Sequence, residues 1–424
     1  MGHFKNPLSL KRPPASRHPR AELLTIGTEL LTGRVLNTNA CYLGRELTHL
    51  GFEVHAQGTC ADEKKAIQEA VRVALGRSDA VFVSGGLGPT PDDITRESLA
   101  ELFAVPLVFS KKQYREIVRY YRKRGGNVPK MVEQEAYFPA NAMPVFNRYG
   151  IALGFIIEEK GKVIVVVPGV PGELTRLFDN HLKGFLKRRF PATRPFASLV
   201  VKTVGLSEPT VMKCLGRGFF NLGKFRFGIY PDVGEVALRI YAESPTVLRR
   251  LKRRIVRGLR DHIYAFSEEP IENAVGNILA SKRWTLGLAE SCTGGQVSEM
   301  ITRVPGSSRY FTGTVVAYDN KVKLKMLQLP REVLRRKGAV SRESALSMAQ
   351  GVRKAFRTSL GVSVTGIAGP SGGTRQKPVG LVYIGIASRT KTRVWKELFG
   401  GDRKQIQDRA SKKVLEYLWR WTRA

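Results

Sequence analysis

The segment Asp79-Ala80-Val81-Phe82-Val83-Ser84-Gly85-Gly86-Leu87-Gly88-Pro89-Thr90 contains an apolar run followed by a glycine-rich loop. The apolar run is typical of a strand buried on both faces of a sheet. A helical pattern precedes it from Asp62 to about Leu75, with Asp62 as the N-cap. Strands that alternate with helices at this spacing predict a mostly parallel, doubly wound sheet. The same unit is predicted to contain strands at 21–27, 52–57 and 162–167, and helices at 39–50, closed by Gly51, and at 173–189.

From residue 195 to about residue 267 the pattern changes to short strands and amphipathic helices. Strands are predicted at 197–204 and 235–242, and helices at 208–215 and 245–259. This pattern predicts a small α+β module of KH-like size. A KH module that binds nucleic acid needs a Gly-x-x-Gly loop, and the nearest candidate, Gly216-Arg217-Gly218, has the wrong spacing. We therefore expect a structural spacer here.

A third unit begins near Ile271 and repeats the alternation of strands and helices. Strands are predicted at 285–289, 310–318, 362–365 and 380–387, and helices at 271–281, 341–357 and 402–421. The predicted fold class is α/β, with two three-layer α/β/α domains joined by a small KH-like α+β module. The predicted boundaries are a disordered basic tail at 1–20, an α/β domain at 21–192, the module at 193–268 and a second α/β domain at 269–424.

The chain is strongly basic, with 70 Lys and Arg against 36 Asp and Glu and a formal net charge of +34. Such an excess raises nucleic acid as a partner. The basic clusters lie in different segments, however, and no repeated interleaving with aromatic residues makes a platform for stacked bases. We therefore expect a solvated basic surface that contacts nucleic acid only through non-specific electrostatics.

Several features of the chain bear on its location. No apolar run approaches the ~20 residues of a membrane-spanning helix, so no membrane contact is expected. The first twenty residues are not followed by the apolar segment of a secretory signal. The four cysteines, at 41, 60, 214 and 292, have neither disulfide nor metal-site spacing. These features predict a cytoplasmic protein.

The third unit carries a serine at a strand end, Ser291, followed by Thr293-Gly294-Gly295 at the start of the next helix. Small residues there leave backbone N–H groups that bind phosphate or stabilise an oxyanion. A serine nucleophile needs a base, and no histidine follows His262. The remaining option is a Ser-Lys pair, for which Lys321 and Lys323, after the next strand, are the candidates. A second glycine-rich turn, at 365–373, adds to the case for a nucleotide-handling site.

Six strings of the third unit resemble, in the same order, the amidohydrolase domain of the CinA (competence-damage-inducible) family. The resemblance implies deamidation of nicotinamide mononucleotide, which yields nicotinate mononucleotide and ammonia and needs no cofactor. The strings are Ala289-Glu290-Ser291-Cys292-Thr293-Gly294-Gly295, Tyr318-x-Asn320-x-x-Lys323, Gly338-Ala339-Val340-Ser341, Gly366-Ile367-Ala368-Gly369-Pro370-x-Gly372-Gly373, Lys377-Pro378-Val379-Gly380 and Gly401-Asp402-Arg403.

Residue by residue, the resemblance implies Ser291 as the nucleophile, Lys323 as its base and Tyr318 as the group that orients or relays the proton. Cys292 is a rival nucleophile that the family pattern ranks below the serine. The family usually has Glu where this chain has Lys321, whose charge would either depress the pKa of the base or point to solvent. The residues implied to line the substrate site are Thr293, Gly294, Gly295, Thr365, Gly366 and Arg403, the last as a phosphate contact.

The first unit resembles the molybdopterin-binding-like domain that precedes the amidohydrolase domain in full-length members of the family. The matching strings are Gly27-Thr28-Glu29-Leu30-Leu31-x-Gly33, Asn37-Thr38-Asn39, Gly85-Gly86-Leu87-Gly88-Pro89-Thr90-x-Asp92-Asp93-x-Thr95 and Pro168-Gly169-Val170-Pro171-x-Glu173. The resemblance implies metal-dependent hydrolysis of ADP-ribose.

The loop around Gly85, Gly86, Gly88 and Thr90 has the chemistry to hold a pyrophosphate. Asp92 and Asp93 beside it are candidate ligands of a divalent metal, although one of them is expected only to cap the next helix. The chain departs from the family nearby. The family often reads Gly-Thr-Ala-Pro-Gly where this chain has Gly150-Ile151-Ala152-Leu153-Gly154, so a hydroxyl and a proline are replaced by Ile151 and Leu153.

The sequence therefore suggests one leading function and two alternatives. The first is a nicotinamide-nucleotide amidohydrolase, whose ligand is a small pyridine nucleotide. The second is a metal-dependent ADP-ribose pyrophosphatase in the first unit, alone or as a second activity. The third is a non-enzymatic, DNA-associated competence protein, which the charge and the family name suggest. A homodimer is expected because multidomain proteins of this kind often associate.

Overall fold

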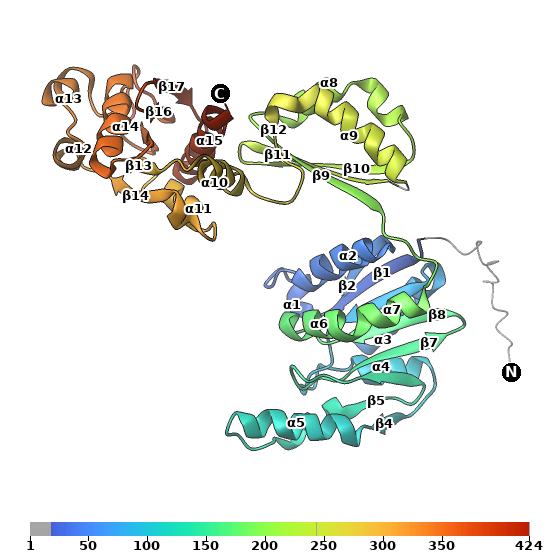
Figure 1. Ribbon diagram of the computed structural model, residues 1–424. Coiled ribbons are helices and arrows are strands. Elements are labelled where there is room, and N and C mark those ends of the chain that lie inside the picture. The colour runs from blue at the N-terminus through green and yellow to red at the C-terminus, as the bar shows by residue number, and fades with distance from the viewer. Residues whose placement is uncertain (1–17, 243, 424) are drawn as a thin grey trace. The chain divides into compact units, whose positions relative to one another are not determined.

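The computed structural model describes residues 18–242 and 244–423, and it divides into two compact units between Phe196 and Ala197 (Figure 1). Residues 1–17 of the predicted disordered tail lie outside the described residues, and the last residue of that tail, Arg20, begins the first strand. Within the described residues no helix is both long and apolar enough to cross a membrane.

The N-terminal unit is built on a six-stranded sheet with the order β2-β1-β3-β8-β7-β6. The first four strands in this order are parallel, and β7 and β6 run antiparallel at one edge. This confirms the doubly wound, mostly parallel prediction. The strands are β1 (Arg20–Ile26), β2 (Glu53–Cys60), β3 (Ala80–Ser84), β6 (Ala142–Val145), β7 (Gly154–Glu159) and β8 (Lys162–Val167).

Helices cover both faces of this sheet (Figure 1). Apolar side chains of α2, α6 and α7 form a core with one face, and those of α3 and α4 form a core with the other. A two-stranded sheet and α5 pack around a small third cluster. The elements are α1 (Thr28–Leu31), α2 (Thr38–Leu50), α3 (Lys64–Arg77), α4 (Thr95–Leu102), β4 (Leu107–Phe109), α5 (Lys111–Lys123), η1 (Lys130–Ala136), β5 (Tyr137–Pro139), α6 (Pro171–Leu177), η2 (Phe178–Leu182) and α7 (Lys183–Arg189).

Two helix ends illustrate how the local sequence acts. Gly51 ends α2 in the left-handed region, at φ 95°, as predicted for a C-cap glycine. The predicted N-cap at Asp62 is wrong, because α3 begins only at Lys64. The Asp62 carboxylate instead accepts hydrogen bonds from the backbone N and the Oγ1 of Thr28, at 2.8 and 3.0 Å. It therefore fixes the loop after β1 rather than the start of the helix.

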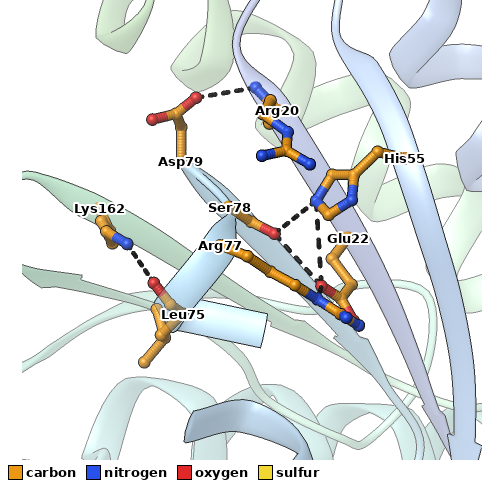
Figure 2. A network of polar contacts seen from close by, with 8 residues as sticks. All are labelled: Arg20, Glu22, His55, Leu75, Arg77, Ser78, Asp79 and Lys162. Atoms are coloured by element: carbon orange, nitrogen blue, oxygen red, sulfur yellow. Dashed lines mark hydrogen bonds and ion pairs between the residues drawn. The ribbon is translucent and has the colours of Figure 1, made fainter. Parts of the chain in front are cut away.

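A buried carboxylate, Glu22, anchors a polar network between β1, β2 and the end of α3 (Figure 2). Arg77 donates two hydrogen bonds to it, at 2.8 and 2.6 Å, and the Ser78 hydroxyl donates a third. The His55 ring lies 4.0 Å away. The hydrogen bond from Arg77 is the main reason that the pKa of Glu22 lies below its ordinary value, against the opposing effect of burial.

The second unit begins with an antiparallel four-stranded sheet of order β10-β11-β9-β12, on which two helices pack. The order of elements, β-α-β-β-α-β, is that of the split βαβ fold. The predicted α+β class is therefore confirmed, while "KH-like" describes only the size of the module. Its elements are β9 (Ala197–Val204), α8 (Glu208–Leu215), η3 (Arg217–Asn221), β10 (Phe225–Asp232), β11 (Glu235–Ala242), α9 (Pro245–Leu259), η4 (Arg260–His262) and β12 (Ile263–Ala265).

The rest of this unit is a three-layer α/β/α arrangement on the sheet β14-β13-β15-β16-β17. Strands β14, β13 and β15 are parallel, and β16 and β17 are antiparallel. Helices α10, α11 and α15 form the core on one face, and α12 and α14 on the other. The elements are α10 (Ile271–Lys282), β13 (Leu286–Glu290), α11 (Gln296–Thr302), η5 (Ser307–Arg309), β14 (Phe311–Val316), α12 (Asn320–Leu327), α13 (Arg331–Lys337), α14 (Arg342–Phe356), β15 (Leu360–Gly366), β16 (Leu381–Ala387), β17 (Thr392–Leu398) and α15 (Arg403–Arg423).

Candidate active site

The three parallel strands of the C-terminal sheet bring the predicted catalytic segments to one edge. Ser291 follows β13, Tyr318 lies two residues beyond β14, and Gly366 ends β15. The backbone N of Ser291 donates to the Val364 carbonyl at 3.0 Å, and the Ala317 N donates to the Glu290 carbonyl at 2.7 Å. The carboxyl ends of parallel strands are where α/β folds place their ligands, so this edge is the natural location of a site.

The buried carboxylate of Glu290 holds the turn after Ser291 in shape. One of its oxygens accepts from the Thr293 hydroxyl at 2.8 Å, the Gly295 N at 3.0 Å and the Val297 N at 3.1 Å. The other accepts from the N of Ser298 at 2.8 Å and from its hydroxyl. The first N–H groups of α11 are therefore satisfied by the protein itself. Sequence reasoning missed this role of Glu290, although the residue stands beside Ser291.

The same turn contains four N–H groups, of residues 292 to 295, of which only the first two remain available. Gly294 N donates to the Ser291 carbonyl at 3.2 Å, and Gly295 N is taken by the carboxylate, so neither supplies the predicted anion nest. Among the described residues, no backbone carbonyl accepts from the N–H groups of Cys292 and Thr293. They are the candidate oxyanion donors. The glycines are required for conformation, because both lie in the left-handed region, at φ 64° and 103°, with no close backbone neighbour.

Lys323, in α12, is only 1% exposed, although it is a lysine. Its ammonium donates to the carbonyls of Ala317, at 2.6 Å, and Tyr318, at 3.0 Å. Burial lowers the pKa of Lys323, against the opposing charge of Asp319. Two donated bonds leave the lone pair of a neutral amine free to accept a proton.

Lys321 does not contribute to the lowered pKa of Lys323. Its side chain is exposed, and burial alone is the cause that lowers the pKa. Ser291 Oγ and the Lys323 ammonium are not within hydrogen-bond distance of each other in the described structure. Such contacts often form only when substrate binds.

Cys292 is disfavoured as the nucleophile by its surroundings. Its side chain is buried, and burial raises the pKa of the thiol to about 12. The thiolate, which is the reactive form of cysteine, is therefore scarce at neutral pH. Its carbonyl accepts a hydrogen bond from Gln407 at 2.8 Å, which ties the turn to α15. These contacts give Cys292 a packing role beside Ser291.

Arg403 connects three segments at the open side of this edge. Its guanidinium donates to the Tyr318 hydroxyl at 2.9 Å and to the Gly369 carbonyl at 2.7 Å. Arg403 is the first residue of α15, where the helix dipole favours an anion, although the Asp402 carboxylate already accepts from the N of Gln405 at 2.9 Å. Tyr318 is 62% exposed. The predicted proton relay and the predicted phosphate contact are thus in direct contact with each other.

Two predicted lining residues serve the fold instead. Thr365 is fully buried, and its hydroxyl donates to the Ala339 carbonyl at 2.9 Å. A Cβ on Gly366 would come within 2.7 Å of the Leu381 carbonyl oxygen, so β16 packs where that side chain would be. Both residues therefore pack against neighbouring segments of the fold, and neither offers a side-chain group to a ligand.

A cavity of about 430 Å³ lies at the corresponding edge of the N-terminal sheet. The predicted glycines pack tightly here: a Cβ on Gly85 would meet the Ile26 carbonyl oxygen at 2.3 Å, and one on Gly86 the Thr95 hydroxyl at 2.1 Å. Ile151 lines the cavity, whereas Leu153 is buried beside it. Its wall includes Gly27, Glu29, Asp62, Gly85, Gly86, Gly88, Asp92, Asp93, Glu135, Ile151 and Glu173.

The predicted metal pair is partly committed to other contacts. The Asp93 carboxylate accepts from both the N and the hydroxyl of Thr90, at 3.0 and 2.5 Å. Asp92 is exposed, and a hydrogen bond from Thr90 lowers the pKa of its carboxyl. In the described part of the chain no group of three or more His, Cys, Asp or Glu is placed to hold a metal ion. A metal at Asp92 and Asp93 therefore stays a prediction.

Glu135 is the most unusual residue of this cavity, and sequence reasoning missed it. It is 1% exposed, and neither carboxylate oxygen has a hydrogen-bond partner in the described structure. Burial is the main cause that raises its pKa to about 8; the guanidinium of the buried Arg96 opposes the shift, and the carboxylates of Glu173 and Asp93 add to it. A buried, unpartnered carboxyl that borders a cavity is typical of functional sites.

Comparison with known proteins identifies the family of the chain. Residues 268–421 match the model of the CinA C-terminal domain, and residues 22–188 match that of a "Probable molybdopterin binding domain". A protein of Desulforudis audaxviator, whose name describes it as competence-damage inducible, is 41% identical over 92% of this chain and 95% of its own length. The chain belongs to the CinA family.

Other CinA proteins are similar to the whole chain or to part of it. A CinA-like protein of Kosmotoga olearia is 38% identical over 95% of this chain and 98% of its own length. Among solved structures, a CinA protein of Thermoplasma acidophilum, described as of unknown function, is 34% identical. That match covers 41% of this chain and 99% of the solved one, with a TM-score of 0.37.

Proposed function

We propose that the C-terminal unit is a nicotinamide-nucleotide amidohydrolase, which hydrolyses nicotinamide mononucleotide to nicotinate mononucleotide and ammonia. The observation that carries the proposal is the buried Lys323, whose pKa is lowered at the strand edge that also holds Ser291. A lysine acts as a base at moderate pH only when its environment favours the neutral amine.

In the proposed mechanism, Ser291 Oγ attacks the carboxamide carbon while Lys323 takes the hydroxyl proton. The N–H groups of Cys292 and Thr293 stabilise the resulting oxyanion. The C–N bond then breaks, and Lys323 returns the proton to the leaving ammonia. Water hydrolyses the acyl-enzyme, which releases nicotinate mononucleotide and restores the serine. Arg403 and the first turn of α15 hold the phosphate.

Ammonia release from nicotinamide mononucleotide tests this proposal. We expect Ser291→Ala and Lys323→Met each to lower kcat by about 10³-fold or more, by analogy with removal of other nucleophile–base pairs. Cys292→Ala should retain most of the activity and is the matched control. Undiminished activity in Ser291→Ala, or loss only in Cys292→Ala, would contradict the Ser-Lys mechanism.

A second candidate function concerns the N-terminal unit: hydrolysis of the pyrophosphate of ADP-ribose. The observation that favours it is the cavity bordered by both the Gly85–Gly88 loop and the unpartnered Glu135. A carboxyl whose pKa is about 8 is suited to general acid–base work near neutral pH. Cleavage of ADP-ribose by the wild type, with and without divalent cations and EDTA, tests it. Glu135→Gln should reduce cleavage at least tenfold, and absence of cleavage by the wild type under all conditions would refute it.

A further inference from the structure

A cavity of about 580 Å³ lies at the edge of the C-terminal sheet opposite to Ser291. It is bounded by the residues where β13 and β15 begin and by the turn from β16 to β17. Strand β13 has five residues, so about 13 Å separates its first residue from its last. A ligand of mononucleotide size bound here would therefore occupy a site separate from that of Ser291. The lining residues are Trp284, Arg353, Arg357, Thr358, Ser359, Leu360, Ser388, Arg389, Thr390, Lys391 and Trp421.

Four cations converge on this cavity, and no acidic residue lines it. Arg353, Arg357, Arg389 and Lys391 take part in no ion pair within the described residues. The Nε of Arg353 is shielded from solvent and lacks a hydrogen-bond partner. This contrasts with other arginines of the same unit, such as Arg335, which pairs with Glu332 at 2.9 Å. Converging positive charges repel each other, and a bound anion relieves that repulsion.

The chemistry of the walls selects one class of anion. Guanidinium groups bind phosphate oxygens in a bidentate manner. Two half-buried indoles, Trp284 and Trp421, add flat apolar surfaces of the kind on which bases stack. The ammonium groups of Lys282 and Lys391 lie 4.6 and 5.1 Å from the centres of these rings. The volume is within the range of small-molecule sites.

We propose that this cavity binds a free nucleotide, with the phosphates on Arg353, Arg357 and Arg389 and the base against the indoles. The turn that carries Arg389 is held in a fixed shape, because the Ser388 hydroxyl accepts from the N of Lys391 at 3.0 Å. The hydroxyl of Ser359, which lines the cavity, by contrast already accepts from the N of Thr285 at 3.1 Å. The guanidinium groups of Arg353, Arg357 and Arg389 are therefore the groups left for a ligand.

Tryptophan fluorescence of the full chain tests the proposal with ADP as the probe. All four tryptophans lie between residues 284 and 421, so binding in the N-terminal cavity gives no direct signal. The titration uses the Ser291→Ala protein in EDTA, which prevents turnover. We expect a saturable change, competition by inorganic pyrophosphate, and binding of adenosine that is at least tenfold weaker because it lacks phosphate.

The double variant Arg353→Gln/Arg357→Gln should bind ADP at least tenfold more weakly. Arg335→Gln/Arg336→Gln removes the same charge from α13 and should bind ADP like the parent. If the first variant does not fold, Arg389→Gln replaces it, because that side chain is exposed. The absence of saturable binding, or equal loss in both double variants, would overturn the proposal. Tighter binding of an oligothymidylate than of ADP would overturn it as well, in favour of a nucleic-acid strand.

Discussion

The guanidinium of Arg403 donates a hydrogen bond to the hydroxyl of Tyr318 over 2.9 Å, and so joins the start of α15 to the segment that follows β14. The second hydrogen bond of the same group, to the Gly369 carbonyl, reaches the loop that follows β15. One side chain thus fixes the relative positions of three segments around the proposed substrate site. In the proposed function, its charge binds the phosphate of the mononucleotide.

Arg403→Gln should raise the KM for nicotinamide mononucleotide at least tenfold, because a charge-assisted contact to phosphate is lost. The KM for nicotinamide riboside, which carries no phosphate, should change little. Lys404→Gln, one residue later and paired with Asp408, is the control. Ammonia release on both substrates measures the effect. An equal loss on the two substrates would mean that Arg403 only positions Tyr318.

The pH profile of kcat/KM reports the protonation of Lys323. Its neutral form is the active base, so activity should rise with pH and reach a plateau below the pH at which an ordinary lysine titrates, about 10.4. Asp319→Asn removes a charge that raises the pKa of Lys323, and should shift the rise to lower pH while it keeps the cap of α12. Lys321→Glu should leave the profile in place. A shift in Lys321→Glu as large as in Asp319→Asn would contradict the role assigned to burial.

The six-stranded and the five-stranded sheet could be predicted from the sequence, because apolar runs and glycine-capped helices are local signals. The strand Lys162–Val167 has the predicted bounds, and β15 extends its predicted core by only a few residues. The region between 95 and 145 could not be assigned, since its strands have three or four residues and its charged helix α5 buries only two side chains. The strand β17 was missed because exposed charges interrupt it at an edge.

The sequence indicated that the segments of Ser291 and Lys323 meet at one edge of the sheet, as they do in the structure, but it did not indicate the residues that support them. The local spacing around Ser291 indicated an anion nest, yet the Glu290 carboxylate folds back and takes the N–H of Gly295. The raised pKa of Glu135 could not be predicted from the sequence, because it comes from burial and from the charges of Glu173 and Asp93, which are far from Glu135 in the chain. Contacts of this kind depend on tertiary packing rather than on residue spacing.

Replacement of Glu290 should destabilise the C-terminal unit. Glu290→Gln turns an acceptor of five hydrogen bonds into a group with one oxygen and an NH₂ that faces donors, a loss on the order of 3 kcal/mol. Urea unfolding followed by tryptophan fluorescence reports on this unit, which holds all four tryptophans. Glu299→Gln, on the exposed side of α11, should change stability by less than about 1 kcal/mol. Equal effects of the two variants would refute the support role of Glu290.

The raised pKa of Glu135 predicts a pH-dependent cost to the N-terminal unit. Below pH 4.5 the carboxyl is protonated in both the folded and the unfolded state, so its ionisation does not lower the free energy of unfolding. Between pH 4.5 and about 8 the unfolded state ionises while the folded state keeps the proton, so stability falls as pH rises.

Glu135→Gln should therefore stabilise the N-terminal unit relative to the wild type, by an amount that grows between pH 5 and pH 8 at roughly 1.4 kcal/mol per pH unit. Above about pH 8 the difference should stay constant, because both states are then ionised. Differential scanning calorimetry across this range measures it. Glu133→Gln, exposed on the same element, is the control and should show no such trend. A difference between Glu135→Gln and the wild type that is independent of pH would show that Glu135 is already ionised in the folded protein, and would remove the case for it as a general acid.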